Sequence, residues 1–215
     1  MRVFVSSTAR DLSGHRAIAG QVIQQLGWQP VLFMEHQSVP TGPSVRACQE
    51  QVANCEQLLL IVGHRCGWIP SRAHGGSGAM SITEIELLTW TEVQRRRGST
   101  IRHPLIMMAS DPSPNEAGER SEDELHRSCQ FMFRQRLRSS GLLIHEFAMP
   151  GDGGESSGMQ AYTATLTTLV SKWNVANAAE NVRRARTGAW ILGALGVALG
   201  IGLASSSEAD QEAPW

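Results

Sequence analysis

Short runs of apolar residues alternate along this chain with longer segments in which apolar residues recur every three or four positions. The first pattern is typical of buried β-strands and the second of amphipathic helices. Together they predict strands at residues 2–6, 30–34, 58–62, 104–108 and 142–147. Helices are predicted at residues 11–26, 43–55, 81–97 and 122–138, and from about residue 159 into the 180s.

The regular alternation of strands and helices predicts the fold class. Strands made of uninterrupted apolar residues are buried on both faces, which is typical of parallel sheets covered by helices. We therefore predict an α/β fold with a five-stranded, mostly parallel, flavodoxin-like sheet and helices on both faces. This domain would occupy residues 1–150, followed by a helix and linker at 151–186, a hydrophobic segment at 187–207 and an acidic tail at 208–215.

The hydrophobic segment from Thr187 to Ser207 contains no charged residue, and Gly188 to Ala204 is entirely apolar or small. Its length falls within the ~17–25 residues that cross a bilayer as a helix. Arginines precede it and acidic residues follow it, at 183, 184 and 186 and at 208, 210 and 212 respectively. Because basic flanks stay cytoplasmic, we predict a single-pass anchor in the inner membrane with the N-terminal domain in the cytoplasm. The alternative is a buried core helix.

The same segment contains two glycines at a spacing that favours helix pairing. Gly196 and Gly200 form a GxxxG pattern, and small residues at this spacing let membrane helices approach closely. We therefore expect self-association, although such patterns also arise by chance in segments rich in glycine and alanine.

Charge and cysteine content exclude several classes of protein. The chain has 19 basic and 20 acidic residues and a formal net charge of −1, so we expect no nucleic-acid partner. Its cysteines have neither CxxC spacing nor paired histidines at zinc-ligand spacing, which predicts reduced thiols and no metal site. The N-terminus also lacks the ~7–15-residue apolar core of a secretory signal.

Hydroxyl and carboxylate side chains follow the first predicted strand. Ser6, Ser7 and Thr8 end that strand, and Asp11 opens the next helix. In doubly wound sheets ligands bind beyond the carboxyl ends of the strands at the switch point, and helix N-termini favour anions such as phosphate. The cluster is therefore a candidate ligand site, and plain helix capping is the alternative.

Two further strand ends carry candidate ligand residues. Glu35 follows the second strand, and His64 and Arg65 follow the third between Gly63 and Gly67. Glycines allow the backbone to approach a ligand closely, and a basic pair can hold a phosphate or pyrophosphate. The alternative is an ordinary glycine-containing turn with solvated charges.

A pair of acidic residues opens the third helix. Ser81 and Glu84 have capping-box spacing, which gives Glu84 a structural role. Glu86 has no such role, and the two acids point about 200° apart on a helix, so only one can face the site. A carboxylate at this place could stabilise an oxocarbenium-like centre at a ribosyl carbon. The alternative is a solvated helix face, and no serine-hydrolase triad, Walker A or GxGxxG pattern is present.

Three ordered segments carry a family resemblance: residues 3–12 followed by Arg16, residues 63–70 and residues 81–86. They resemble a bacterial domain of unknown function found at the N-terminus of STAND/NACHT-type signalling NTPases. That family resembles TIR domains and nucleoside deoxyribosyltransferases in fold. The resemblance implies a nucleotide-binding site that includes Arg16, and N-glycosidic chemistry with Glu86 as the catalytic acid and Glu84 second. It also implies a role in bacterial defence or stress signalling.

Three functional hypotheses follow. The first is a membrane-anchored TIR-like sensor or signalling domain that binds a nucleotide or an NAD-derived ligand, with a signalling NTPase or TIR-like protein as partner. The second is an enzyme that cleaves the N-glycosidic bond of NAD or a nucleoside. The third is a non-catalytic adaptor that acts through homotypic contacts.

Overall fold

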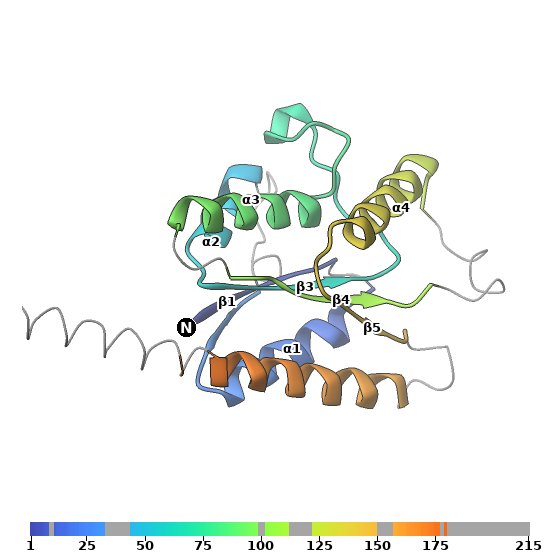
Figure 1. Ribbon diagram of the computed structural model, residues 1–215. Helices are drawn as coiled ribbons and strands as arrows, with labels where there is room; N and C mark the ends of the chain where they lie inside the picture. The colour runs from blue at the N-terminus through green and yellow to red at the C-terminus, as the bar shows by residue number, and fades with distance from the viewer. Residues whose placement is uncertain are drawn as a thin grey trace, which may run out of the picture. The chain divides into compact units, whose positions relative to one another are not determined.

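The computed structural model describes residues 1–8, 11–32, 44–98, 102–111, 122–149, 157–176 and 179. Its sheet has five strands in the order β2-β1-β3-β4-β5, and all four neighbouring pairs are parallel (Figure 1). This is the flavodoxin-like strand order of doubly wound sheets. The strands are β1 (Arg2–Ser6), β2 (Gln29–Val31), β3 (Gln57–Val62), β4 (Leu105–Ala109) and β5 (Ile144–Phe147).

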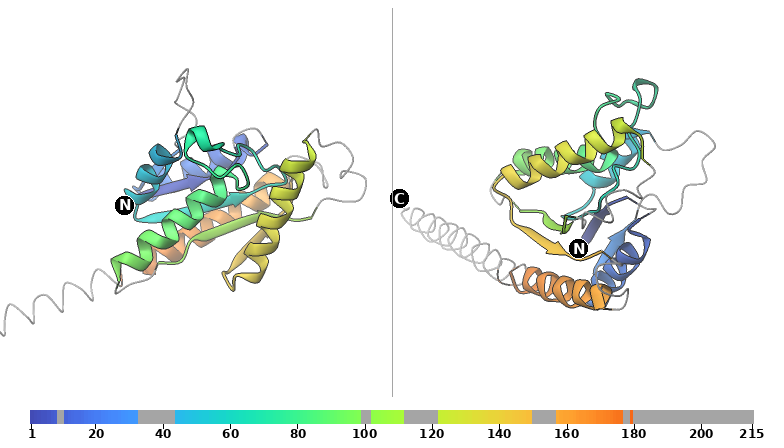
Figure 2. Two further views of the ribbon diagram at one scale, coloured as in Figure 1. Left: turned by 90° about the horizontal axis from the view of Figure 1, so that it is seen from above. Right: turned by 90° about the vertical axis from the view of Figure 1, so that its right-hand side faces the viewer.

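Helices cover both faces of this sheet, as the sequence predicts (Figures 1 and 2). One face carries α2 (Val45–Ala53), α3 (Ile82–Arg97) and α4 (Glu124–Ser139). The opposite face carries α1 (Ser13–Gln25) and residues 157–170 of a helix that spans residues 157–176. A short 3₁₀ helix, η2 (Arg72–His74), interrupts the connection from β3 to α3.

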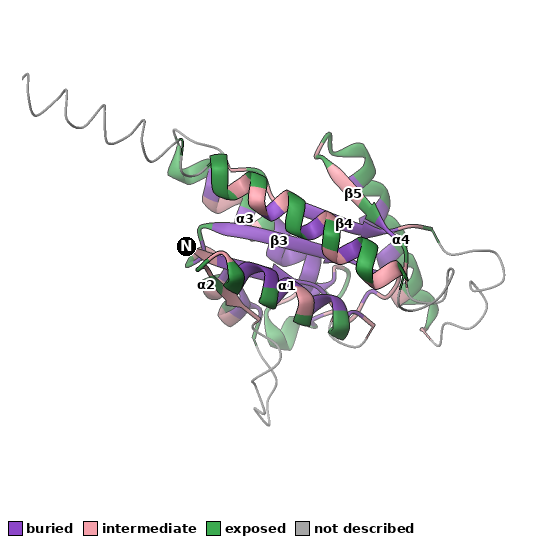
Figure 3. Ribbon diagram, turned by 90° about the horizontal axis from the view of Figure 1, so that it is seen from below, coloured by how far each residue is buried: buried purple, intermediate pink, exposed green. Residues whose placement is uncertain are grey.

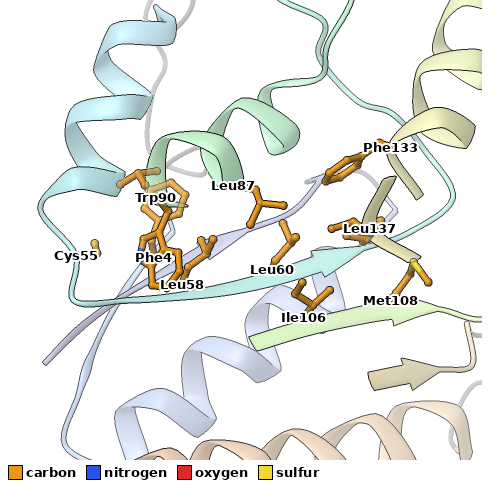
Figure 4. Packing of buried hydrophobic residues seen from close by; sticks show 12 residues of the cluster. Phe4, Cys55, Leu58, Leu60, Leu87, Trp90, Ile106, Met108, Phe133 and Leu137 are labelled. Atoms are coloured by element: carbon orange, nitrogen blue, oxygen red, sulfur yellow. The ribbon is translucent and has the colours of Figure 1, made fainter. Parts of the chain in front are cut away.

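The central strand β3 is buried along its whole length (Figure 3). Its apolar side chains alternate between the two faces, so both helical layers pack on the same strand. On the α3 and α4 face the core joins Phe4 of β1 and Leu58 and Leu60 of β3 to Trp90 and Phe133 of the helices (Figure 4). This packing on both faces explains why residues 58–62 of β3 are all apolar.

The chain divides into two compact units, Met1–Val170 and Ser171–Trp215. Tyr162, Leu166 and Val170 of helix 157–176 are fully buried, which places this part of the helix in the first unit. Among the described residues, no helix has the length and apolar character needed to cross a membrane. The predicted span at 187–207, its GxxxG pattern and the arginines before it lie outside the described residues.

Candidate functional site

The switch point of the sheet lies between β1 and β3. From β1 the chain continues through α1 to β2 on one side, and from β3 it continues through α3 to β4 on the other. Because the two connections diverge, the carboxyl ends of β1 and β3 leave room for a ligand between the following loops. Ser6 ends β1 and Val62 ends β3, so the residues after them lie at this place.

Glu86 points at the end of β1. Its carboxylate oxygen Oε2 accepts a hydrogen bond of 2.5 Å from the Ser6 hydroxyl, and both residues are buried. Burial raises the pKa of Glu86 to about 7, while the Ser6 hydrogen bond and the positive charge of Arg16 oppose this rise. The carboxyl therefore exchanges its proton near neutral pH, unlike an ordinary glutamate.

Arg16 fixes the turn that follows β1. This side chain is buried in α1, and its Nη1 donates 2.8 Å to the Ser7 hydroxyl oxygen. The same nitrogen lies 3.3 Å from the backbone carbonyls of Val5 and Ser7. The guanidinium thus brings a buried positive charge to the end of β1, close enough to influence the ionisation of Glu86.

The loop after β1 packs directly against the loop after β3. Thr8 donates its hydroxyl to Asp11 Oδ1, and the other Asp11 oxygen, Oδ2, is buried without a hydrogen-bond partner. A Cβ at Gly63 would lie 2.5 Å from Asp11 Oδ2, and one at Gly67, where φ is 71°, would lie 2.7 Å from Thr8 Cγ2. Only glycine permits this approach, so the two predicted ligand loops form one structure.

The first turn of α1 has no side-chain cap. Leu12 stands at its N-cap without a side-chain hydrogen bond, and Asp11 is turned toward Thr8 instead. Helix capping therefore does not account for Asp11. An uncapped helix N-terminus favours an anion.

Glu84 lies away from this cluster. Its two carboxylate oxygens accept 2.8 Å hydrogen bonds from Nε and Nη2 of Arg136, which joins α3 to α4. Ser81 does cap α3 by accepting from the Glu84 backbone N–H at 3.2 Å, so one half of the expected capping box is present. Of the two acids, Glu86 meets the predicted ligand residues and Glu84 forms an interhelical ion pair.

The basic pair after β3 diverges. His64 Nε2 lies 2.6 Å from the Ser110 carbonyl beyond β4, while Arg65 Nε lies 3.5 Å from Glu122 Oε1. About a third of the Arg65 side chain is exposed, which leaves it accessible to an anionic ligand. Glu35, the candidate at the end of the second predicted strand, lies outside the described residues.

Comparison with known proteins identifies the domain that carries this cluster. A family model described as a domain of unknown function, DUF4062, matches residues 2–158. The chain belongs to the DUF4062 family. The segments 3–12, 63–70 and 81–86 all lie within the matched range. No curated protein and no solved structure matches the chain.

Two buried residues of α4, which the sequence analysis did not select, also bind the backbone at the strand ends of the DUF4062 domain. Gln130 Nε2 and Arg134 Nη1 donate 2.7 and 3.1 Å hydrogen bonds to the Gly63 carbonyl. Arg134 Nη2 also donates to the Ala109 carbonyl at 2.7 Å and to Asp111 Oδ1 at 2.8 Å. Both lie beside Phe133 and Leu137 on the apolar face of α4, and this periodicity is the signal that could have revealed them.

The cysteines of the DUF4062 domain are buried free thiols. Burial raises the pKa of Cys55 to about 11, and burial together with a hydrogen bond to Cys129 raises that of Cys66. A high pKa keeps a thiol protonated and unreactive. Within the part of the chain that the structure describes, no group of three or more histidine, cysteine or acidic residues is arranged to hold a metal ion.

Proposed function

We propose that this protein is a membrane-anchored, TIR-like signalling domain that binds a nucleotide or an NAD-derived ligand at the carboxyl ends of β1 and β3. The main observation in support is a cluster of polar side chains at the switch point. Glu86 accepts a hydrogen bond from Ser6, Arg16 donates to Ser7, and Thr8 donates to Asp11. Ligands of doubly wound sheets bind at this place. The resemblance to the N-terminal domain of STAND/NACHT-type NTPases supports a signalling role in bacterial defence or stress, with such an NTPase or a TIR-like protein as partner.

The charges around the cluster favour a ligand with an anionic part. The uncapped first turn of α1 attracts phosphate, and Arg65 supplies a partly exposed guanidinium at the neighbouring loop. Gly63 and Gly67 let Asp11 and Thr8 pack against the loop after β3, which brings the two loops together beside Arg65. A nucleotide phosphate or pyrophosphate fits this combination of groups.

A second candidate function is cleavage of the N-glycosidic bond of NAD or a nucleoside, with Glu86 as the catalytic residue. The observation that favours it is the pKa of Glu86, which burial raises to about 7. General acids and bases work best when their pKa lies near the working pH, and strongly shifted carboxyls gather at active sites.

One assay separates the two functions. The purified full chain, held in detergent micelles, is incubated with NAD and with nucleosides, beside Glu86→Gln and the control Glu92→Gln on the exposed side of the same helix. Base release that Glu86→Gln abolishes and Glu92→Gln retains supports the enzyme. Absence of base release, together with an increased melting temperature in the presence of NAD, supports the signalling domain, because a ligand that binds the folded state stabilises it.

Two arginine variants, one in the candidate site and one outside it, test ligand binding. Arg65→Gln removes a charged hydrogen-bond donor and should weaken NAD binding by about tenfold. Arg46→Gln removes an exposed arginine from the surface ion pair with Glu50 on α2 and should leave binding unchanged. A chain that neither releases base nor responds to NAD or nucleosides contradicts both candidates and leaves the homotypic adaptor.

We also propose that residues 187–207 form a single membrane-spanning helix that self-associates through Gly196 and Gly200, with the DUF4062 domain in the cytoplasm. The absence of charge, the preceding arginines and the acidic tail support this arrangement. After alkaline carbonate washing the full chain should stay in the membrane pellet and cross-link as an oligomer. Gly200→Ile should stay in the pellet but cross-link less. Extraction of the wild type contradicts the span, and unchanged cross-linking of the variant contradicts the pairing.

A further inference from the structure

Helix 157–176 follows the DUF4062 match almost entirely, because the matched range ends at residue 158. It nevertheless packs on the domain through Tyr162, Leu166 and Val170, which are all fully buried. These residues are spaced four apart and form one narrow stripe along the helix. The fully buried contacts of the helix therefore lie along one line.

The first turn of α1 receives the beginning of this helix. The Tyr162 hydroxyl donates to the His15 carbonyl at 3.3 Å, and a Cβ on Gly14 would lie 3.2 Å from Met159 Cε. The His15 ring packs against two aromatic rings, those of Tyr162 and Phe147, which also contact each other at a centroid distance of 5.1 Å. Its centroid is 4.6 Å from that of Tyr162, edge to face, and 4.9 Å from that of Phe147 in β5.

His15 carries a polar group that this packing leaves unsatisfied. The residue is 1% exposed, and its Nε2 is buried without a hydrogen-bond partner. Burial lowers the pKa of His15, and the smaller attraction of the Asp11 carboxylate opposes that effect. A neutral imidazole can be buried here at little cost. Protonation would place a charge and an Nε2–H donor in a site where Nε2 has no hydrogen-bond partner.

In the part of the chain that the structure describes, few other charged or titratable groups lie near His15. Arg16, the next residue of α1, directs its guanidinium to Ser7, and His145 shares the face of β5 that carries Phe147. In the described part of helix 157–176, the titratable side chains are Tyr162 and Lys172, which lies beyond the docked stripe. Among the described residues, Asp11 is the group whose charge opposes the effect of burial on His15.

We propose that His15 is an acid-operated latch: protonation of its imidazole places a charge against the rings of Tyr162 and Phe147 and undocks residues 157–170 from the rest of the domain. Because the folded state holds the imidazole neutral, docking is complete above the ordinary histidine pKa of 6.5 and is lost as the pH falls through the lower value of the folded protein. The sheet core on the opposite face does not include this helix, so the release is local. Undocking lengthens the tether between the DUF4062 domain and the residues that follow. The proposal does not depend on the ligand site.

A single spectroscopic probe can test the latch, because Tyr162 is the only tyrosine in the chain. The full chain in detergent micelles is labelled with 3-fluorotyrosine, so that its ¹⁹F spectrum contains one resonance. We expect a shifted, broad resonance of the docked ring at pH 7.5. As the pH falls below 6.5 this resonance should lose intensity to one near free 3-fluorotyrosine, while the helical circular dichroism of the domain persists.

Two variants and one control decide the outcome. His15→Phe and His15→Gln cannot acquire the charge, so whichever of them folds should keep the docked resonance down to pH 5. His145→Gln, on the neighbouring strand, should titrate like the wild type. The latch is wrong if the His15 variants show the same acid transition, if the wild-type resonance does not change, or if the loss of docking coincides with unfolding of the whole domain.

Discussion

Arg134→Met is expected to lower the free energy of unfolding by about 2–3 kcal/mol. Arg134 is buried in α4 and donates to the Gly63 and Ala109 carbonyls at the ends of β3 and β4. Methionine has a similar length and fills the space, so the loss comes from the hydrogen bonds. Gly63 keeps its bond from Gln130, whereas Arg134 makes the side-chain bond to Ala109. A buried carbonyl without a donor costs about 1–3 kcal/mol.

Chemical denaturation of the full chain in detergent, followed by tryptophan fluorescence, measures this loss. Arg138→Met is the matched control, because Arg138 binds the same Asp111 oxygen as Arg134 from the exposed side of α4. Exposed ion pairs contribute about 0–1 kcal/mol, so the control should change stability little. Equal effects of the two substitutions would mean that the ion pairs with Asp111, and not the strand-end carbonyls, account for the role of Arg134.

The strand positions followed from the sequence wherever apolar packing alone sets them. β1 has the predicted bounds, because Val3, Phe4 and Val5 form an uninterrupted buried apolar run in its middle. β3 begins one residue earlier than predicted, at Gln57, whose backbone pairs with Val3 and whose amide donates 2.9 Å to the His103 carbonyl. A buried polar residue with a tertiary partner cannot be recognised from periodicity, because its partner is distant in the chain.

The second strand shows why the ends of a strand at the edge of a sheet are hard to predict from the sequence. The sequence predicts residues 30–34, whereas β2 spans Gln29–Val31, and residues 33 and 34 lie outside the described residues. β2 is an edge strand, and its described pairing with β1 runs from Gln29 opposite Arg2 to Val31 opposite Phe4. The ends of such a strand are set by its single partner and not by its own hydrophobicity.

The candidate site could be predicted as a set of strand ends but not as a set of contacts. The switch-point rule selected the loops after β1 and β3, and the structure packs Thr8 and Asp11 against Gly67 and Gly63. Helix geometry allowed one of two acids to face the site without deciding which. The choice depends on Arg136, which lies 52 positions after Glu84 and forms its ion pair.

Glu86→Gln is expected to change the pH dependence of stability by about 3 kcal/mol. The folded protein holds the pKa of Glu86 at about 7, above the ordinary value of 4.5, because the carboxyl is buried. The folded state therefore keeps a proton that the unfolded chain releases between these two pH values. The resulting stabilisation is complete below pH 4.5 and is lost as the pH rises through 7. Glutamine stays neutral, and its amide oxygen can still accept the Ser6 hydrogen bond.

The measurement is the difference in unfolding free energy between the variant and the wild type from pH 5 to pH 8. This difference should move in favour of Glu86→Gln as the pH rises. Glu92→Gln on the same helix should follow the wild type over this range, because Glu92 is exposed and its pKa is lowered by Arg95 and Arg96. A flat difference for Glu86→Gln would mean that Arg16 and Ser6 keep the buried carboxylate ionised at all these pH values.

The difference must be measured because His15 titrates in the opposite sense. Burial lowers the pKa of His15, so its contribution to stability grows as the pH rises toward 6.5, while that of Glu86 declines. The two effects partly cancel in the wild-type profile. Glu86→Gln removes one of them and should reveal a stability that rises from pH 5 to pH 6.5 and then stays level. His15→Gln should reveal the reverse, a decline toward pH 8. The pair of variants thus separates the proton held at the candidate site from the proton that operates the latch.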